Sequence, residues 1–413
     1  MAIDSGDTTF LLLSAALVLI MTPALGFFYG GLARRKNVSA TIMHSFSSVI
    51  VISVVWVLWG YSLAFGPDIG GFVGSLQWFG LNDVGLQPNP DYSATVPHQA
   101  FMIFQLMFAI ITPALMTGAF AERMKFCSFM LFIVLWSTFV YSPIAHWVWG
   151  VGGWLGSLGT LDFAGGTVVH ISAGVAALVA TLVIKKRIGY GDEDMAPHNI
   201  PFVVLGTAFL WFGWFGFNAG SALVAGSLAT SAFVATNTAG AAAALTWLCI
   251  DCLHKGKPSV VGACVGAIAG LAAITPASGF VGPMASLVIG SSAAGLCYLA
   301  VQLIHKSKRP IDDALDVFGV HGIGGIWGTI ATGIFAEGAI NGTDGLLFGN
   351  FTQMIPQLIG IGATLGYSFV VTLVILLILD KTIGLRVKPG EEKAGLDISI
   401  HGEESYEREP RRK

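Results

Sequence analysis

Long apolar stretches separated by short polar segments dominate this chain. A membrane-spanning helix needs about 20 mostly apolar residues, and eleven stretches come close to that length or exceed it. They cover residues 9–32, 40–65, 99–121, 126–146, 167–185, 200–218, 229–250, 259–275, 283–304, 318–337 and 355–380. The pattern therefore predicts an all-α integral membrane protein with eleven transmembrane helices.

The composition excludes the main soluble classes. Hydrophobic residues make up 54% of the 413 residues, charged residues make up 11%, and the mean hydropathy is +0.74. A typical soluble domain is about 25% charged. These values exclude a soluble globular protein, a nucleic-acid binder and a disordered chain. We expect a lipid bilayer around the molecule and no nucleic acid among its partners.

The basic residues set the expected orientation. All 21 Lys and Arg residues follow odd-numbered apolar stretches, and the other loops contain none. The positive-inside rule then predicts an external N-terminus and a cytoplasmic C-terminus in the cell (inner) membrane. Termini on opposite sides require an odd number of spans, which agrees with eleven. The start, MAIDSGDTTF, lacks the positive region of an ordinary cleaved signal peptide.

Two domains follow from this distribution. Residues 1–385 are expected to form the transmembrane domain, and the polar, charged residues 386–413 a cytoplasmic tail. The external side carries acids but no Lys or Arg. This negative charge either serves to attract cations or is only a by-product of the positive-inside bias. These acids are Asp4, Asp7, Asp68, Asp83, Asp91, Asp162, Glu337 and Asp344.

A weak internal repeat relates the two halves of the chain. GFFYGG (26–31) matches GFNAGS (216–221), and GGTVVHISAG (165–174) matches FGVHGIGG (318–325). Each half contains five spans, so the halves have inverted topologies, and the eleventh helix lies outside the repeat. In an inverted five-plus-five repeat the substrate path runs between the halves near the midplane.

Two histidines lie within apolar spans at matching places of the repeat, His170 and His321. One such histidine alone would be explained by a bond to a backbone carbonyl. Two at matching places predict a facing pair, in which one imidazole donates and the other accepts. A metal site would need a third ligand, and we expect no Asp, Glu or Cys at this depth and hence no metal or cofactor. The seven other histidines are expected at the membrane interfaces.

Aromatic residues gather at the external ends of several spans. A ring of aromatic faces with one hydroxyl would bind a small cation through cation–π attraction and a hydrogen bond. The alternative is an interfacial aromatic belt, which we keep for Trp147 and Trp154. The candidates for the cation site are Phe104, Phe108, Trp149, Phe217 and Ser221.

Asp162 precedes the span that contains His170. Its carboxylate either caps the first amides of that helix or supports a cation at the external mouth, and the two roles are compatible. The glycines of GIGGIWG (322–328) predict close helix packing rather than a phosphate loop. No serine nucleophile elbow, HExxH or Walker motif is present, so an enzyme is not expected.

Together these motifs resemble the Amt/MEP/Rh ammonium transporter family, specifically a bacterial or archaeal Amt. The resemblance covers nearly the whole chain. It rests on GFFYGGL (26–32), AER (121–123), AHWVWG (145–150), LDFAGGTVVH (161–170), GWFGFNAGSA (213–222), DVFGVHG (316–322) and the GLRV, GLD and HGE of the tail. The resemblance implies that the protein recruits ammonium, deprotonates it and conducts ammonia, with or without separate proton transfer. Methylammonium is an alternative substrate.

The resemblance also assigns roles to residues. Phe108, Trp149 and Ser221 match the external ammonium-recruitment site, beside which Phe104 is a vestibule candidate. Phe108 and Phe217 match the stacked phenyl gate. The twin histidines of the pore and the acid near the external mouth correspond to His170, His321 and Asp162.

The resemblance implies partners as well. Relatives form homotrimers with one pore per subunit, and residues 384–407 look like the Amt tail, which communicates with a P-II signal protein in relatives. A plain solvated tail is the alternative, and EREPRRK departs from the typical ending. Two further hypotheses remain open: an ammonium sensor that signals through the tail, and a membrane enzyme with a two-histidine metal site.

Overall fold

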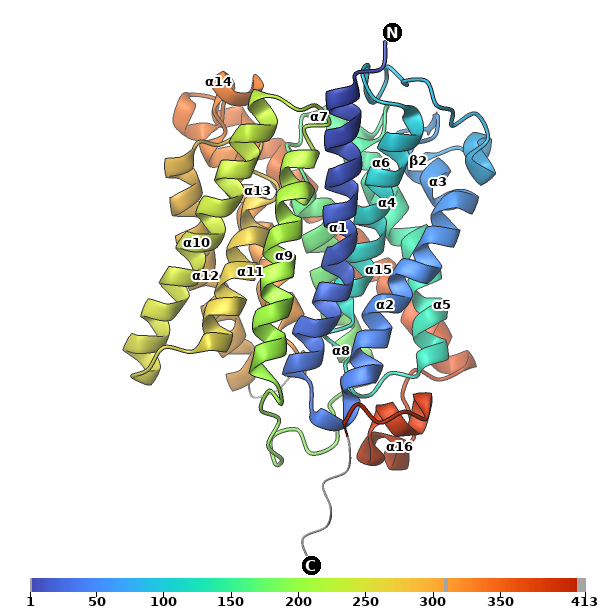
Figure 1. Ribbon diagram of the computed structural model, residues 1–413, viewed down its shortest axis with the longest axis vertical. Helices are drawn as coiled ribbons and strands as arrows, with labels where there is room; N and C mark the ends of the chain where they lie inside the picture. Colours follow the sequence, from blue (N-terminus) through green and yellow to red (C-terminus); the bar gives the residue numbers. More distant parts are fainter. Residues whose placement is uncertain (1, 308–310, 407–413) are drawn as a thin grey trace, which may run out of the picture.

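The protein is a bundle of long helices that share one main direction (Figure 1). The computed structural model describes residues 2–307 and 311–406. Within this part, ten helical segments are long and apolar enough to span a membrane, and α11 (Val260–Ile274) is a shorter apolar helix. Its 15 residues span about 22 Å. The predicted all-α membrane fold is confirmed.

The first half of the bundle contains eight α-helices and one small hairpin. They are α1 (Ser5–Leu32), α2 (Val38–Val55), α3 (Tyr61–Phe65), β1 (Asp68–Ile69), β2 (Val73–Gly74), α4 (His98–Met116), α5 (Phe126–Trp136), α6 (Ser142–Trp149), α7 (Trp154–Leu158) and α8 (Ser172–Ile184). The hairpin is antiparallel and pairs Asp68 with Gly74 and Ile69 with Val73.

The second half and the tail follow. They contain α9 (Ile200–Gly220), α10 (Ser227–Lys255), α11, α12 (Pro283–Lys306), α13 (Ile323–Phe335), α14 (Gly338–Asn341), α15 (Met354–Thr382) and α16 (Pro389–Ala394). Four π-helical turns lie in spans. Two interrupt a helix, η2 (Trp56–Gly60) and η4 (Ser137–Tyr141), and two begin a span, η5 (Gly166–Ile171) and η6 (Phe318–Gly322). The expected end of the fourth span at residue 146 is too early, because α5, η4 and α6 run on to Trp149.

The halves are related as the repeat predicts. Helices α1 and α9 each begin a half and pack side by side in opposite directions (Figure 1). A Cβ on Gly216 of α9 would lie 2.7 Å from the Leu17 Cβ of α1, so glycine permits this close approach. In each half a π-helical turn with its histidine leads into a helix of 13 residues, α8 or α13.

The two spans that begin with π-helical turns touch where they carry their histidines. Gly174 of α8 lies against the backbone of Gly322 in η6, and a Cβ on Gly325 of α13 would lie 2.9 Å from the His170 Cβ. A larger side chain at either glycine would separate the helices. The contact between halves is therefore set by glycine at the level of His170 and His321.

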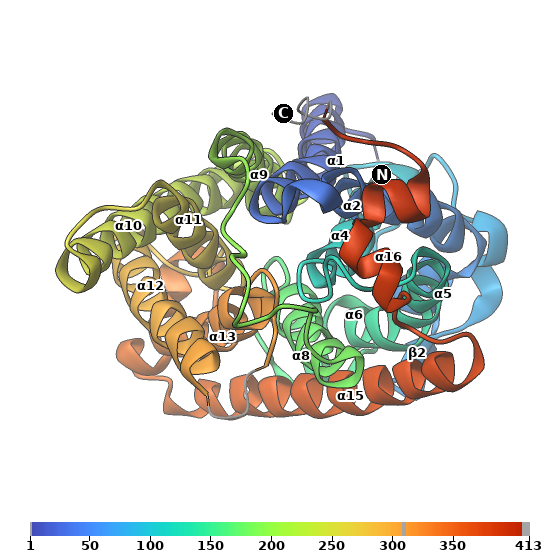
Figure 2. The ribbon, with the colours of Figure 1, turned by 90° about the horizontal axis from the view of Figure 1, so that it is seen from below.

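The bundle has two distinct ends. We call the end where α1 begins, with the hairpin and α14, the upper end, and the end with α16 the lower end (Figure 1). Ion pairs join loops at the lower end, such as Arg187 Nη2 with Asp312 Oδ1 at 2.8 Å. Figure 2 shows α16 beside α2 and α5 at this end, with α15 along one side of the bundle.

Candidate functional site

A cavity of about 220 Å³ lies at the upper end of the bundle. Three residues that the sequence predicts together, Phe108, Trp149 and Ser221, line this one space. The Phe108 and Trp149 ring centroids are 5.8 Å apart at 83°. The remaining lining residues are Asp91, Tyr92, Phe101, Gln105, Phe163 and Leu223. We call this space the upper cavity.

Hydrogen bonds to the backbone orient the polar groups of the upper cavity. Trp149 is the last residue of α6, and its Nε1 donates to the Asp162 carbonyl oxygen at 2.9 Å. Ser221 follows α9, and its hydroxyl donates to the Phe217 carbonyl oxygen at 2.9 Å. Because the serine proton is used there, the lone pairs of its oxygen are free to accept a hydrogen bond from a cation.

Gln105 is a cavity residue that the sequence reasoning missed. It lies on α4, three residues before Phe108, and its buried Oε1 has no hydrogen-bond partner among the described residues. The i, i+3 spacing from Phe108 in an apolar helix was the available signal. Phe104 lies elsewhere: it is fully buried and packs edge-on against Phe108, with centroids 5.0 Å apart, and it does not line the cavity.

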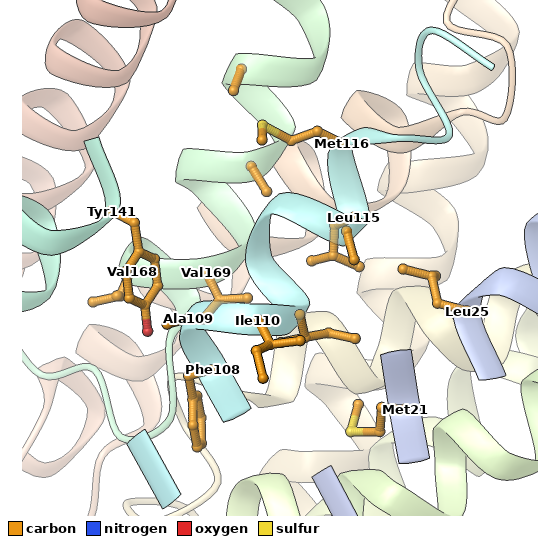
Figure 3. Close-up of a cluster of buried hydrophobic side chains, with 14 of the residues drawn as sticks. Met21, Leu25, Phe108, Ala109, Ile110, Leu115, Met116, Tyr141, Val168 and Val169 are labelled. Atoms are coloured by element: carbon orange, nitrogen blue, oxygen red, sulfur yellow. The ribbon is translucent and has the colours of Figure 1, made fainter. Parts of the chain in front are cut away.

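Two phenyl rings close the floor of the upper cavity. The Phe108 and Phe217 centroids are 4.3 Å apart at 41°, and each side chain is 1% exposed. Phe217 also lines a second, much smaller cavity of about 10 Å³, which we call the lower cavity. Its wall is apolar apart from His170, His321 and Trp214, and Figure 3 shows part of that wall, including Met21, Leu25, Leu115 and Val169.

The structure brings His170 and His321 together in the lower cavity. Their Nδ1 atoms are 3.3 Å apart, and their rings are nearly parallel with centroids at 5.2 Å. His170 Nε2 lies 3.4 Å from the Thr275 hydroxyl, which donates its proton to the Leu271 carbonyl oxygen at 2.8 Å. That contact therefore places the His170 proton on Nε2, so His321 Nδ1 donates to His170 Nδ1.

A metal at this pair is not supported by the surrounding residues. The described part of the chain contains no group of three His, Cys, Asp or Glu residues that could hold a metal ion. The expectation that no cysteine lies at this depth is wrong, because the Cys297 sulfur is 3.7 Å from the Val320 carbonyl oxygen, next to His321. How far along the membrane Cys297 lies relative to His321 depends on how the two helices are aligned, and hydropathy alone does not determine that alignment.

Asp162 caps the helix that carries His170. Its carboxylate accepts the N–H groups of residues 165–168 at 2.6–3.3 Å, together with the Thr167 hydroxyl. The side chain is buried and does not line the upper cavity. Through its own carbonyl oxygen Asp162 also holds the Trp149 ring, so one residue fixes parts of both cavities.

Several residues expected at the membrane interface are buried instead. His44, His98 and His146 are 6%, 4% and 0% exposed, and the Trp147 indole donates to the Phe72 carbonyl oxygen at 2.8 Å. Among the external acids, Asp7 is buried and accepts the Ala225 N–H at 2.9 Å. His44 is covered by the rings of Phe126 and Phe129 of α5, and His146 by the Ala64 carbonyl oxygen and Asp68. Distance from the end of an apolar run does not reveal such cover.

Comparison with known proteins identifies the family. The model of the Ammonium Transporter Family matches residues 9–406. The chain is 52% identical over 404 residues to an ammonium transporter of Bacillus subtilis, covering 97% of this chain and 98% of that protein. It is also similar to the crystal structure of Saccharomyces cerevisiae Mep2 (TM-score 0.88, 39% identity, 94% of this chain and 88% of that one).

A second solved structure, titled a sensor Amt protein, is similar over 96% of this chain and 98% of its own, with TM-score 0.88 and 31% identity. The family match extends over nearly all of the described residues, including both cavities and most of the tail. This chain therefore belongs to the Ammonium Transporter Family and is a multi-pass membrane protein.

Proposed function

We propose that this protein transports ammonium across the cell membrane, with the upper end outside and the lower end in the cytoplasm. The observation that carries the proposal is the stacking of the two cavities: an aromatic and polar one above Phe108 and an apolar one with two histidines below Phe217. The absence of Lys and Arg from one set of loops supports the orientation.

The upper cavity recruits the ammonium ion. The faces of Phe108 and Trp149 attract the cation through their π electrons. The Ser221 oxygen accepts one N–H, and the unpartnered Gln105 Oε1 accepts a second. These groups replace part of the hydration shell, which lowers the cost of moving the ion out of bulk water.

The phenyl pair and the lower cavity exclude the charged form. An isolated cation in an apolar space of about 10 Å³ loses its hydration without a compensating charge, which is very unfavourable. Ammonium therefore gives up a proton at or before Phe108 and Phe217. Ammonia then crosses beside His170 and His321, whose nitrogens exchange hydrogen bonds with it. The proton either stays outside or crosses separately.

The tail forms a second, regulatory domain from residue 386. Contacts with the transmembrane part support a structured tail rather than a solvated one. Glu392 Oε1 accepts the Ile188 N–H at 2.6 Å, and Asp397 Oδ1 accepts the Ala40 N–H at 2.8 Å. We infer a homotrimer with a P-II protein bound at this face. The final residues EREPRRK lie outside the described part of the chain.

A sensor role is the second candidate, favoured by the similarity to a structure titled a sensor Amt protein. In this case ammonium occupancy is reported through the tail and transport is secondary. Deleting the residues after 385 would then abolish signalling while ammonium flux persists. Loss of flux in that variant would argue against separate signalling.

An ammonium pulse onto proteoliposomes on a solid-supported membrane tests the transport proposal. A saturable transient current, absent from empty liposomes, would show that charge crosses with the substrate. No current, with faster interior alkalinisation than in empty liposomes, would show passage of neutral ammonia. Neither signal above the empty control would contradict transport.

A further inference from the structure

The upper cavity has an acidic side chain in its wall, and it is Asp91. Asp162, the acid expected at the external mouth, is buried, caps a helix and does not line this space. Asp91 is exposed and is the one acid among the described lining residues. Within the part of the chain that the structure describes, no hydrogen bond or ion pair engages its carboxylate. Both carboxylate oxygens are therefore available to a ligand in the cavity.

Backbone contacts hold Asp91 at the cavity. Asn89 Oδ1 accepts the Asp91 N–H at 3.1 Å, and the Asn89 carbonyl oxygen accepts the Tyr92 N–H, also at 3.1 Å. An asparagine side chain often forms such a turn with the backbone two residues further on. The start of α1 holds the same loop, because the Asp4 N–H donates to the Thr95 carbonyl oxygen at 2.8 Å. The carboxylate is thus carried by a backbone that is fixed from two sides.

Tyr92 joins this loop to two walls of the upper cavity. Its ring stacks on Phe101 of α4, with centroids 4.7 Å apart at 17°. Its hydroxyl donates to the Phe65 carbonyl oxygen and accepts the Val151 N–H, two residues after Trp149, at 3.4 Å. Asp91 is therefore the direct neighbour of a residue that packs on both α4 and the segment after Trp149.

The other polar groups of the upper cavity are neutral. Gln105 is 8% exposed and its Oε1 has no partner among the described residues, and Ser221 offers the lone pairs of its hydroxyl oxygen. Such acceptors replace part of the hydration of a cation but do not compensate its charge. A carboxylate in a cleft raises the local concentration of cations, and dissolved salt weakens this effect. Asp91 supplies the charge that the neutral acceptors lack.

We propose that Asp91 is a further cation-binding residue of the upper cavity and that its charge concentrates ammonium beside Phe108 and Trp149. This inference deepens the proposed function and rests on it. The attraction depends on charge and distance, so the carboxylate draws ammonium and methylammonium alike, and the rings and neutral acceptors discriminate between them. Asp91 lies above the partition formed by Phe108 and Phe217. Its charge therefore sets the KM and leaves the maximal rate unchanged.

Methylammonium uptake by proteoliposomes at fixed pH tests this role in sodium chloride of about 0.01 M and about 1 M, where the Debye length is about 30 Å and about 3 Å. In low salt we expect Asp91→Asn to raise the KM about threefold. In high salt the wild-type KM should rise to that of the variant. Asp91→Glu keeps the charge and should keep the wild-type salt dependence. Asp83→Asn removes an exposed acid of the same connection that does not line the cavity, and is the matched control.

Two results would overturn the inference while the proposed function stands. One is saturable wild-type uptake with a KM that rises in Trp149→Leu but not in Asp91→Asn at low salt. The other is an Asp91→Asn effect of the same size in high salt, which would show a structural role of the side chain instead of an electrostatic one. If the wild-type protein shows no saturable uptake, the proposed function fails and the inference fails with it.

Discussion

The upper and lower cavities are neighbours with opposite character. The upper one has about 220 Å³ and includes Asp91, Gln105 and Ser221 in its wall, whereas the lower one has about 10 Å³ and an apolar wall around two histidines. Phe108 lines the first and Phe217 the second, and their stacked rings are the partition. A charged ligand is compatible with the first space and a neutral one with the second, and under the proposed function the proton is given up at this partition.

The largest effect is expected at Asp162, which supports both regions. Asp162→Ala leaves several buried N–H groups without an acceptor, at about 1–3 kcal/mol each. We expect a large loss of folded protein, measured as thermal unfolding in detergent, with both cavities affected. Asp162→Asn keeps one acceptor oxygen and should lose less. Equal stability of the alanine variant and the wild type would refute the capping role.

Replacing the twin histidines tests the role of the lower cavity. Replacing both by alanine (His170→Ala with His321→Ala) removes the hydrogen-bonding groups that meet ammonia in the lower cavity. Leaving a polar molecule without partners costs about 2 kcal/mol, so the maximal uptake rate should fall at least about tenfold. His44→Ala, a buried histidine outside both cavities, is the control. Retained uptake with intact exclusion of other ions would remove the pair from the mechanism.

Replacing Gln105 tests cation binding in the upper cavity. Gln105→Leu keeps the approximate volume but removes the acceptor oxygen, worth about 1 kcal/mol to a bound cation. Ammonium KM should rise about fivefold with an unchanged maximal rate. Gln99→Leu on the same helix, away from the cavity, is the matched control. Equal KM values for the two variants would show that Gln105 does not contact the ion.

The smallest effect on transport is expected at Asp313, outside both cavities at the lower end. Burial and the nearby charge of Asp316 raise the pKa of Asp313 to about 7. A raised carboxyl pKa stabilises the fold at acidic pH, and this contribution is lost as the pH rises towards 7. Asp313→Asn keeps an acceptor for the Phe318 N–H and should unfold at higher temperature than the wild type near about pH 8 but not near about pH 5. The same difference at both pH values would contradict this assignment.

The sequence predicted the membrane-spanning pattern and several residues that line the two cavities, for different reasons. Apolar runs and basic loops show the spans directly, and the two histidines stand out because polar residues are costly inside a span. The roles of Phe108, Trp149 and Ser221 came from the family resemblance, and the structure adds that they share one cavity. The π-helical turns under His170 and His321 leave no trace in hydropathy.

Burial near the helix ends was the part that could not be predicted. His146 looks interfacial in the sequence because it lies near the end of an apolar run. In the structure the hairpin and the end of α3 cover it completely. The partner of a histidine is set by which loop folds over it, and Asp68 is 78 residues away along the chain.

The concentration dependence of ammonium uptake, compared between Trp149→Leu and the double histidine variant in matched proteoliposomes, tests the division between the cavities most directly. Binding above the partition and passage below it predict a raised KM with a near wild-type maximal rate for Trp149→Leu. They predict a reduced maximal rate with a near wild-type KM for the double variant. A reduced maximal rate with unchanged KM in Trp149→Leu would contradict the account.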